Sequence, residues 1–224
     1  MSSNPFPAAW PAESEIPTTL RSRHFAIVRL ANNKAMMDMS LSLLAKEKGV
    51  RAKQEKLFIN CTQIVPNGSN ITAWHALDGP TFRVIAQAIM NHQWVTAISQ
   101  HWWGKEPLCR VYAANAPHTQ NYQWVDYKGG ADRKQNNAII SRVLKLTYTD
   151  QEGHQYPWAL DMQEGPGRLM PTGAVQPIAG AAPTARVLMN LSWMQILQWM
   201  QLGQEALAAV TQYDMARWLQ SLSS

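Results

Sequence analysis

The sequence has few cysteines, few acidic residues and no long apolar run. Two cysteines, Cys61 and Cys109, cannot supply the four ligands of a structural zinc site, and their separation fits no CxxC pattern. We expect both to be buried thiols. The lack of about eighteen consecutive apolar residues argues against a membrane-spanning helix. Residues 1–10 contain no basic segment followed by an apolar one, so we expect no signal peptide and a cytoplasmic protein.

Motifs for catalysis and for cofactor binding are also missing. The six histidines show no HxH or HExxH spacing, and there is no Gly-x-Ser-x-Gly or local Cys/His signature. Gly165-Pro166-Gly167 is neither a dinucleotide-binding nor a phosphate-binding loop. RNA cleavage by one His and one Lys stays open, but we expect no enzyme activity, no metal site and no cofactor.

The chain is nevertheless rich in Trp, Met and basic residues. Its 224 residues, 46% of them hydrophobic and 16% charged, are enough for a folded protein of one large domain or two small ones. Ten Trp and eleven Met stand beside twenty Lys and Arg and only fifteen Asp and Glu, which gives a net charge of +5. This composition indicates contact with a polyanion.

The positive charge lies in the first 150 residues. Residues 1–56 hold nine bases and five acids, and residues 101–150 hold seven bases and four acids. Residues 151–224 reverse the balance, with three bases and five acids. This asymmetry is expected if one end of the protein faces phosphates and the other faces protein, and an ordinary solvated surface is the alternative.

The first part of the chain predicts a strand, a helix and a hairpin. Residues 23–30 alternate basic, aromatic and aliphatic side chains, as in a strand. Residues 31–56 contain Met and Leu followed by a basic run, which predicts a short helix ending near Gly49. Residues 57–65 and 71–77 are β-rich, and the Asn-Gly pair between them supplies the positive φ angles of a tight connection.

The middle of the chain predicts a helix followed by strands. From Asp78 to about Trp102, apolar residues recur every three or four positions, which is typical of a helix with one face in the core. Residues 128–137 are polar and basic and predict a loop, and residues 164–183 are so rich in Gly and Pro that we expect a loop there too. The predicted strands of this part are 108–113, 122–127, 139–149 and 156–163.

The end of the chain predicts a strand and two helices. Residues 186–191 form the strand, Ser192 caps the first helix, and Thr211 begins the second in capping-box form. The fold class is therefore α+β, with antiparallel strands, a central helix and a C-terminal helical pair. We divide the chain into a Pro-rich leader (1–20), a basic strand-rich nucleic-acid-binding region (21–163), a Gly/Pro-rich loop (164–185), and a strand with a C-terminal helical pair (186–224).

Basic residues are the candidate contacts to phosphates, because Lys and Arg neutralise a nucleic-acid backbone. They cluster on the first strand, at the end of the expected first helix and in the 128–137 loop, and a solvated surface is the alternative for each cluster. The candidate phosphate-binding residues are Arg21, Arg23, Arg29, Lys46, Lys48, Arg51, Lys53, Lys56, Lys128, Arg133, Lys134 and Arg168.

Aromatic residues are the candidate stacking platforms for unpaired bases. Burial in the core is the alternative interpretation for each of them. The stacking candidates are Trp74, Trp102, Trp103, Tyr122, Trp124 and Tyr127. Three further Trp residues in the weakly charged C-terminal helices indicate core or a subunit interface, and they are Trp193, Trp199 and Trp218.

One segment resembles a known motif. The stretch from Gly165 to Val175 reads GPGRLMPTGAV and is similar to the glycine-rich loop, G-x-G-x5-G-x-G, of RNA-binding folds in CRISPR effector complexes, with Val175 in place of the last glycine. The resemblance implies a subunit of an RNA-guided complex, in which neighbouring subunits cover the aromatic helices. It also implies that the basic faces follow guide RNA or target DNA, with readout of a short flanking duplex motif.

Three functions therefore remain open. The first is a non-catalytic nucleic-acid-binding subunit of a larger nucleoprotein complex, with RNA or DNA and other protein subunits as partners and no membrane. The second is a single-stranded-DNA-binding protein that acts alone or as a homo-oligomer. The third is an assembly protein whose Trp- and Met-rich surfaces bind other proteins and whose charge is incidental.

Overall fold

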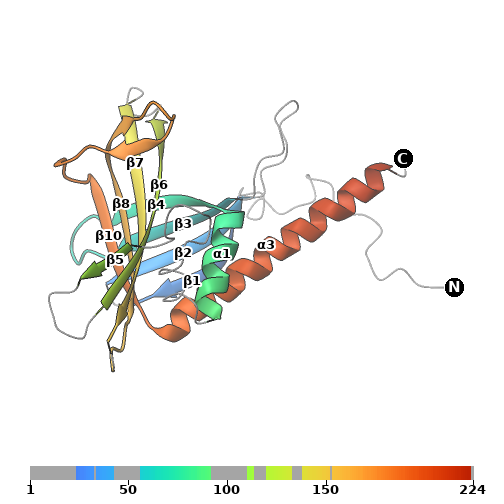
Figure 1. Ribbon diagram of the computed structural model, residues 1–224, viewed down its shortest axis with the longest axis horizontal. Coiled ribbons are helices and arrows are strands. Elements are labelled where there is room, and N and C mark those ends of the chain that lie inside the picture. The colour runs from blue at the N-terminus through green and yellow to red at the C-terminus, as the bar shows by residue number, and fades with distance from the viewer. Residues whose placement is uncertain are drawn as a thin grey trace.

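The described residues form two antiparallel sheets and two helices (Figure 1). The computed structural model describes residues 24–32, 34–42, 56–91, 110–113, 120–132, 138–151 and 153–222. The first sheet has the strand order β1-β2-β3-β4. Its strands, and the helix that follows them directly, are β1 (His24–Ala31), β2 (Ala35–Ser42), β3 (Lys56–Gln63), β4 (Ile71–Asp78) and α1 (Gly79–Met90).

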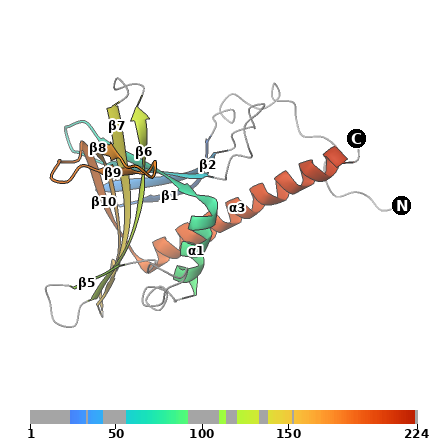
Figure 2. The same cartoon turned by 45° about the horizontal axis from the view of Figure 1, so that its top comes forward.

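The second sheet has the order β10-β8-β7-β6-β5, and the short strand β9 pairs with the end of β8. The strands of the two sheets run in different directions and cross (Figures 1 and 2), and α3 continues beyond both sheets toward the C-terminus. No helix of the described residues is long and apolar enough to cross a membrane. The elements are β5 (Arg110–Ala113), β6 (Gln120–Asp132), β7 (Ala138–Asp150), β8 (Trp158–Leu169), β9 (Val175–Pro177), β10 (Ala185–Leu191) and α3 (Trp193–Leu222).

The two halves of the chain follow the same plan. Strands β1 to β4 and then α1 correspond in order and neighbours to β6, β7, β8, β10 and then α3. In the last strand of each half, buried inward residues alternate with outward ones in the same way. In both halves the helix starts within two residues of the end of this strand. The inward residues are Ala73, His75 and Leu77 in β4, and Val187, Met189 and Leu191 in β10.

The core lies between the two sheets and the helices. Trp199 of α3 is buried, and its Nε1 donates to the Sδ of Met39 in β2 at 2.8 Å. Gly203 of α3 lies so close to Phe82 of α1 that no side chain would fit between them. Cys61 is buried as expected, and this burial, with the nearby charge of Asp38, raises the pKa of its thiol. Cys109 lies outside the described residues.

The helix that closes the chain begins with a reciprocal cap. The backbone N of Gln195 donates to Oγ of Ser192 at 3.3 Å, and the backbone N of Ser192 donates to Oε1 of Gln195 at 2.9 Å. These two bonds satisfy amide groups that a helix start leaves without partners. The predicted cap at Ser192 is therefore confirmed.

Several other predictions are confirmed as well. The α+β class with antiparallel strands is correct, and so are the first strand, the hairpin and the strand before α3. Asn67 has φ 58° in the connection between β3 and β4, where the Asn-Gly pair predicts a positive φ. Helix α1 starts after Asp78 as predicted and is described to Met90, and the predicted extension to Trp102 lies outside the described residues.

Four predictions of secondary structure are wrong, and three of them concern segments that contain strands. The expected helix within 31–56 contains strand β2, because Ala35, Met37 and Met39 alternate inward with a period of two although Met favours helices. The loop expected over 164–183 contains the end of β8 and all of β9, and part of the loop expected over 128–137 belongs to β6.

The expected C-terminal helical pair is a single helix. Oγ1 of Thr211 donates to the carbonyl oxygen of Leu207 at 2.9 Å, one turn earlier in the same helix. The same Oγ1 accepts a bond from Nη2 of Arg83 in α1 at 2.9 Å. Thr211 therefore joins α3 to α1 from inside the helix and does not cap a new one.

Candidate nucleic-acid interface

A cluster of polar and aromatic side chains lies where β4, the edge of the first sheet, meets the second sheet. Strand β4 contacts β7 and β8 there, and its side chains reach groups on β6 as well. We call this cluster the β4 corner. It consists of Trp74, His75 and Asp78 of β4, Asp126 and Lys128 of β6, Arg142 of β7, and Glu164 of β8.

Trp74 presents a partly exposed aromatic ring at this corner. The side chain points away from the core, since its neighbours Ala73 and His75 are buried while Trp74 is 36% exposed. Cζ of Arg142 lies over the ring, 4.0 Å from its centroid, and the ring of Phe58 lies 6.0 Å away, centroid to centroid. A guanidinium over an indole face is a favourable cation–π contact. The ring is thus held in place while part of it faces solvent.

Arg142 is itself fixed by a carboxylate. Its Nε donates to Oε2 of Glu164 at 2.7 Å, and both side chains are mostly buried. A charge-assisted bond of this length with little exposure to water is stronger than a bond between neutral groups. The guanidinium over Trp74 therefore has a defined orientation.

The second part of the corner is an ionic network around Lys128. Nζ of Lys128 lies 2.7 Å from Oδ2 of Asp78 and 3.7 Å from Oδ2 of Asp126. Burial alone would lower the pKa of Lys128, but the hydrogen bond to Asp78 and the charges of both carboxylates outweigh it and raise the pKa. Lys128 therefore stays charged and joins β6 to β4.

His75 completes the network from the inside. Its side chain is fully buried, and its Nε2 lies 2.8 Å from Oδ2 of Asp126. Its Nδ1 has no hydrogen-bond partner among the described residues. Because water does not reach the ring, we assign His75 a role in holding β4 against β6 and not a role in binding a ligand.

Strand register places three charged groups of the corner in one row. Lys128 pairs with Arg142 across β6 and β7, and Arg142 pairs with Glu164 across β7 and β8. Directly paired residues on neighbouring strands point to the same face of a sheet. The inward face of the second sheet therefore carries an ammonium, a guanidinium and a carboxylate, in that order, and the guanidinium is the group that lies over Trp74.

The phosphate candidates have mixed outcomes. Lys128 belongs to the corner. Arg29 is bound to Asp38, with Nε 2.6 Å from Oδ1, and this bond raises the pKa of Arg29. Arg168 is exposed on β8, four residues beyond Glu164 of the corner. The side chain of Lys56 lies outside the described residues, and so do Arg21, Arg23, Lys46, Lys48, Arg51, Lys53, Arg133 and Lys134.

Of the stacking candidates, Trp74 keeps an accessible ring at the corner. Tyr127 is 47% exposed, but it points to the opposite face of β6 from Lys128. Tyr122 and Trp124 are buried, so the prediction that they stack on bases is wrong. Their positions on β6 alternate toward the core, and the ring of Tyr122 stacks on that of Tyr148 at 6.2 Å. Trp102 and Trp103 lie outside the described residues.

The three Trp residues predicted to lie in the core or at a partner interface have different outcomes. Of the two alternatives, core or partner interface, Trp199 takes the core. Trp193 is half-buried against Trp158, with the ring centroids 5.4 Å apart. The side chain of Trp218 is outside the described part of α3. A partner contact at Trp193 or Trp218 stays a prediction.

Sequence reasoning missed Arg142, Glu164, His75 and Asp126. One signal for Arg142 was available, because it interrupts the inward positions Ile140, Leu144 and Leu146 of an otherwise apolar strand face. A charged residue at such a position needs a buried partner. Its partner Glu164 could not be identified, because strand pairing and not chain proximity brings the two together.

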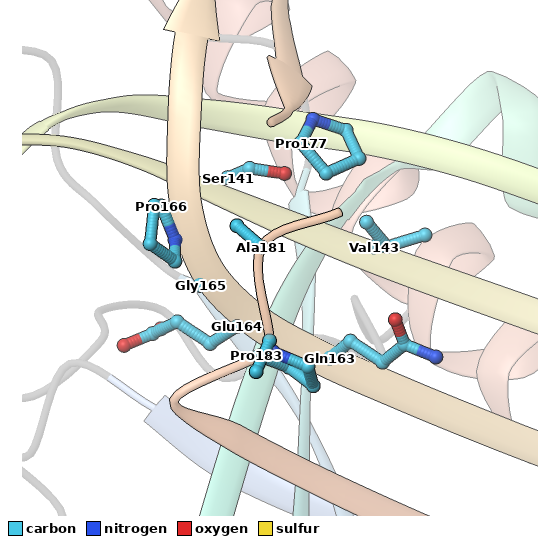
Figure 3. Close-up of a pocket in the computed structure, with 10 residues that line it drawn as sticks. Ser141, Val143, Gln163, Glu164, Gly165, Pro166, Pro177, Ala181 and Pro183 are labelled. Atoms are coloured by element: carbon cyan, nitrogen blue, oxygen red, sulfur yellow. The ribbon is translucent and has the colours of Figure 1, made fainter. Parts of the chain in front are cut away.

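A small cavity lies apart from the corner. Figure 3 shows the chain around Ala181 and Pro183 passing over the strands that carry Ser141, Val143 and Gln163. The cavity has a volume of about 40 Å³, and Oγ of the buried Ser141 has no hydrogen-bond partner among the described residues. That space suits a water molecule and is too small for a nucleobase.

The segment that resembles a CRISPR glycine-rich loop is ordered in the fold. Gly165 to Leu169 belong to β8, Gly173 has φ 81° in the following turn, and Val175 begins β9. No model of a protein family matches the sequence, and no curated protein matches it either. No group of three His, Cys, Asp or Glu within the described ranges could hold a metal ion.

Proposed function

We propose that this chain binds single-stranded nucleic acid without catalysing a reaction on it, as a subunit of a larger nucleoprotein complex. The observation that carries the proposal is the partly exposed Trp74 ring, held under the guanidinium of Arg142. Unpaired bases need flat faces on which to stack, and each such contact is worth about 1–3 kcal/mol. The β4 corner offers such a face on a rigid support.

The same corner is a poor site for phosphates. It combines the cations Lys128 and Arg142 with three carboxylates, and both cations are already bound to carboxylates. A phosphate would have to displace one of these groups and would meet the others at short range. The proposal therefore assigns the corner to a base and the backbone phosphates to other residues.

The basic residues of 46–56 and 133–134 are the proposed phosphate contacts. Lys56 is the first residue of β3, and Arg133 follows directly after β6, the strand that carries Lys128. Most of the sequence's surplus of bases lies in these segments. A binding mode that divides stacking and phosphate contacts between two groups of residues is common for single strands. Membership of an RNA-guided complex stays a prediction from the resemblance at Gly165 to Val175.

Fluorescence anisotropy of a labelled single-stranded oligonucleotide tests this function. For the Trp74→Ala variant we expect the dissociation constant to rise about tenfold, because one base loses its stacking partner. Tyr156→Ala is the matched control, since Tyr156 is 42% exposed and lies outside the corner, and its affinity should equal that of the unaltered protein.

The salt dependence of the same titration separates the two kinds of contact. Trp74→Ala should leave the slope of log affinity against log salt unchanged, since the ring carries no charge. Equal affinities for Trp74→Ala and Tyr156→Ala would contradict the placement of the site. A lack of binding by the unaltered protein, with protein partners alone in material from the native host, would instead favour the assembly function.

A further inference from the structure

We infer that the bound single strand crosses the outer face of the first sheet from Trp74 to Arg29, and that Arg29 supplies an additional phosphate contact. This inference rests on the proposed function, because the path begins at the base that stacks on Trp74. It follows from strand register, which places four side chains in one line across the sheet. We call this line the Trp74 row, and it consists of Trp74 of β4, Asn60 of β3, Asp38 of β2 and Arg29 of β1.

The Trp74 row lies on the face of the first sheet that points away from the core. Trp74 pairs with Asn60, Asn60 pairs with Asp38, and Asp38 pairs with Arg29. Directly paired residues on neighbouring strands point to the same face of a sheet. In each of the four strands, the residues directly before and after the row residue are buried. Successive side chains of a strand point to opposite faces, so the four row residues point outward.

Both ends of the row are accessible to a ligand. Trp74 is 36% exposed, and the side chain of Arg29 is 65% exposed. Asn60 and Asp38 between them are partly buried. Helix α3 packs on the opposite face of this sheet, against Met39 of β2. A single strand can therefore lie along the row without displacing α3.

The length of the row fits a short stretch of single strand. Strands β1 to β4 lie side by side (Figure 1), and neighbouring strands of a sheet are about 4.8 Å apart, so β4 and β1 are separated by about 14 Å. Stacked nucleotides follow one another every ~3.4 Å along a strand. Up to about four nucleotides therefore span the row, and fewer do so when the strand is extended.

Arg29 keeps donors for a phosphate although it is bound to Asp38. Its Nε lies 2.6 Å from Oδ1 of Asp38, and its Nη2 lies 3.3 Å from Oδ2. A guanidinium carries five N–H groups, and this contact uses two of them. The carboxylate thus fixes the orientation of the planar fork, and the other N–H groups can bond a phosphate.

This ion pair differs from those of the β4 corner, where phosphate binding is disfavoured. Lys128 lies near two carboxylates, and the side chain of Arg142 is only 14% exposed. Arg29 is bound to one carboxylate and is mostly exposed to water. Repulsion between Asp38 and a phosphate is weak at such a surface, because the effective dielectric constant is high. The far end of the row therefore suits a phosphate better than the corner does.

Arg29→Gln tests this path in the anisotropy titration described above. Loss of one phosphate contact should weaken binding about fourfold at 0.15 M salt and reduce the slope of log affinity against log salt by about 0.7. Arg186→Gln is the matched control. Arg186 binds Asp161 through Nε at 3.0 Å and Nη2 at 2.9 Å, its side chain is 55% exposed, and it lies on β10, outside the row. This control should keep the affinity and the slope of the unaltered protein.

Asp38→Asn tests the same path with the opposite sign. The amide still accepts a bond from Arg29 but no longer repels the phosphate, so the affinity should rise about threefold. Asp161→Asn is the matched control and should not change the affinity. A partly unfolded variant would bind less and not more, so a gain in affinity cannot result from damage to the fold.

The outcomes separate the inference from the proposed function. Equal affinities and slopes for Arg29→Gln and Arg186→Gln, with weaker binding by Trp74→Ala, overturn the path and leave the proposed function intact. If Arg29→Gln is unfolded by circular dichroism, Asp38→Asn decides, and no gain over Asp161→Asn overturns the path. A lack of binding by the unaltered protein overturns both.

Discussion

At the scale of single residues, the face of the strand to which a side chain points decides whether it lies in the core or at the candidate site. Trp74 and Trp124 look equivalent in the sequence, since each lies in a β-rich run between one polar and one apolar residue. Trp124 alternates into the core at 8% exposure, while Trp74 alternates outward under Arg142. Composition identified both as stacking candidates, and only the strand register distinguishes them.

His75 is a polar residue at a position that the other half of the chain fills with an apolar one. When the last strands are aligned on the residue before each helix, His75 corresponds to Met189, and both are fully buried. The imidazole gives up a hydrogen bond at Nδ1 and gains one to Asp126 at Nε2. Packing and this single bond therefore both contribute to stability.

Two substitutions at His75 separate these contributions. His75→Ala should lower the free energy of unfolding by about 2–4 kcal/mol, because it leaves a cavity and removes the partner of Asp126. His75→Met should cost less than about 1.5 kcal/mol, because methionine fills the space and Lys128 still neutralises Asp126. Urea unfolding of both variants measures the difference. Equal losses of unfolding free energy in His75→Met and His75→Ala would show that the hydrogen bond to Asp126, and not the packing, dominates.

At the scale of elements, glycines in β6 and β8 serve close packing. Val175 of β9 is buried against Gly129 and Gly167, and a Cβ on Gly167 would lie 2.8 Å from Cγ1 of Val175 and 2.8 Å from the backbone N of Ser141. The abundance of Gly and Pro in 164–183 predicts a loop from the sequence. The glycines there instead allow a strand to lie against its neighbours, which composition alone does not reveal.

Gly167→Ala and Gly130→Ala form a matched pair in this sheet. Gly167→Ala should lower the free energy of unfolding by about 1–3 kcal/mol, because its Cβ meets backbone that cannot move away easily. Gly130→Ala should be neutral or slightly stabilising, since no atom lies within 4 Å of its Cβ position. Thermal or urea unfolding checks both values. A larger loss for Gly130→Ala than for Gly167→Ala would refute this description of the packing.

The elements that the sequence predicts correctly are marked by short motifs at their ends. The hairpin of β3 and β4 has its Asn-Gly turn, and α3 has its Ser-x-x-Gln cap. The prediction of a helix at β2 is wrong because the Met residues of this segment favour a helix by composition. The buried positions Ala35, Met37 and Met39 instead follow the period of a strand. Tertiary packing overrides propensity in such a segment.

At the scale of the whole molecule, the surplus of basic residues and the exposed Trp74 ring belong to different segments of the chain. Four of the described cations are each bound to a carboxylate, and they are Arg29, Lys128, Arg142 and Arg186. The basic clusters of 46–56 and 133–134 carry much of the net charge. The sequence predicts both kinds of contact, and our proposal assigns base stacking to Trp74, which lies under Arg142 where the two sheets cross.

The pairing of residues at that crossing could not be foreseen. Trp74, Lys128 and Glu164 are far apart in the chain, and their proximity depends on how one sheet lies over the other. Trp74 and Lys128 were candidates for separate reasons, and the fold places both at the β4 corner.

Ultraviolet cross-linking of a bound single-stranded oligonucleotide, followed by mass spectrometry of tryptic peptides, tests the central claim most directly. We predict that the principal cross-link among the described aromatic residues falls on Trp74, in the peptide of residues 57–83. Cross-links at Tyr127 or Tyr156 with none at Trp74 would contradict the account, because both are exposed aromatic residues outside the corner.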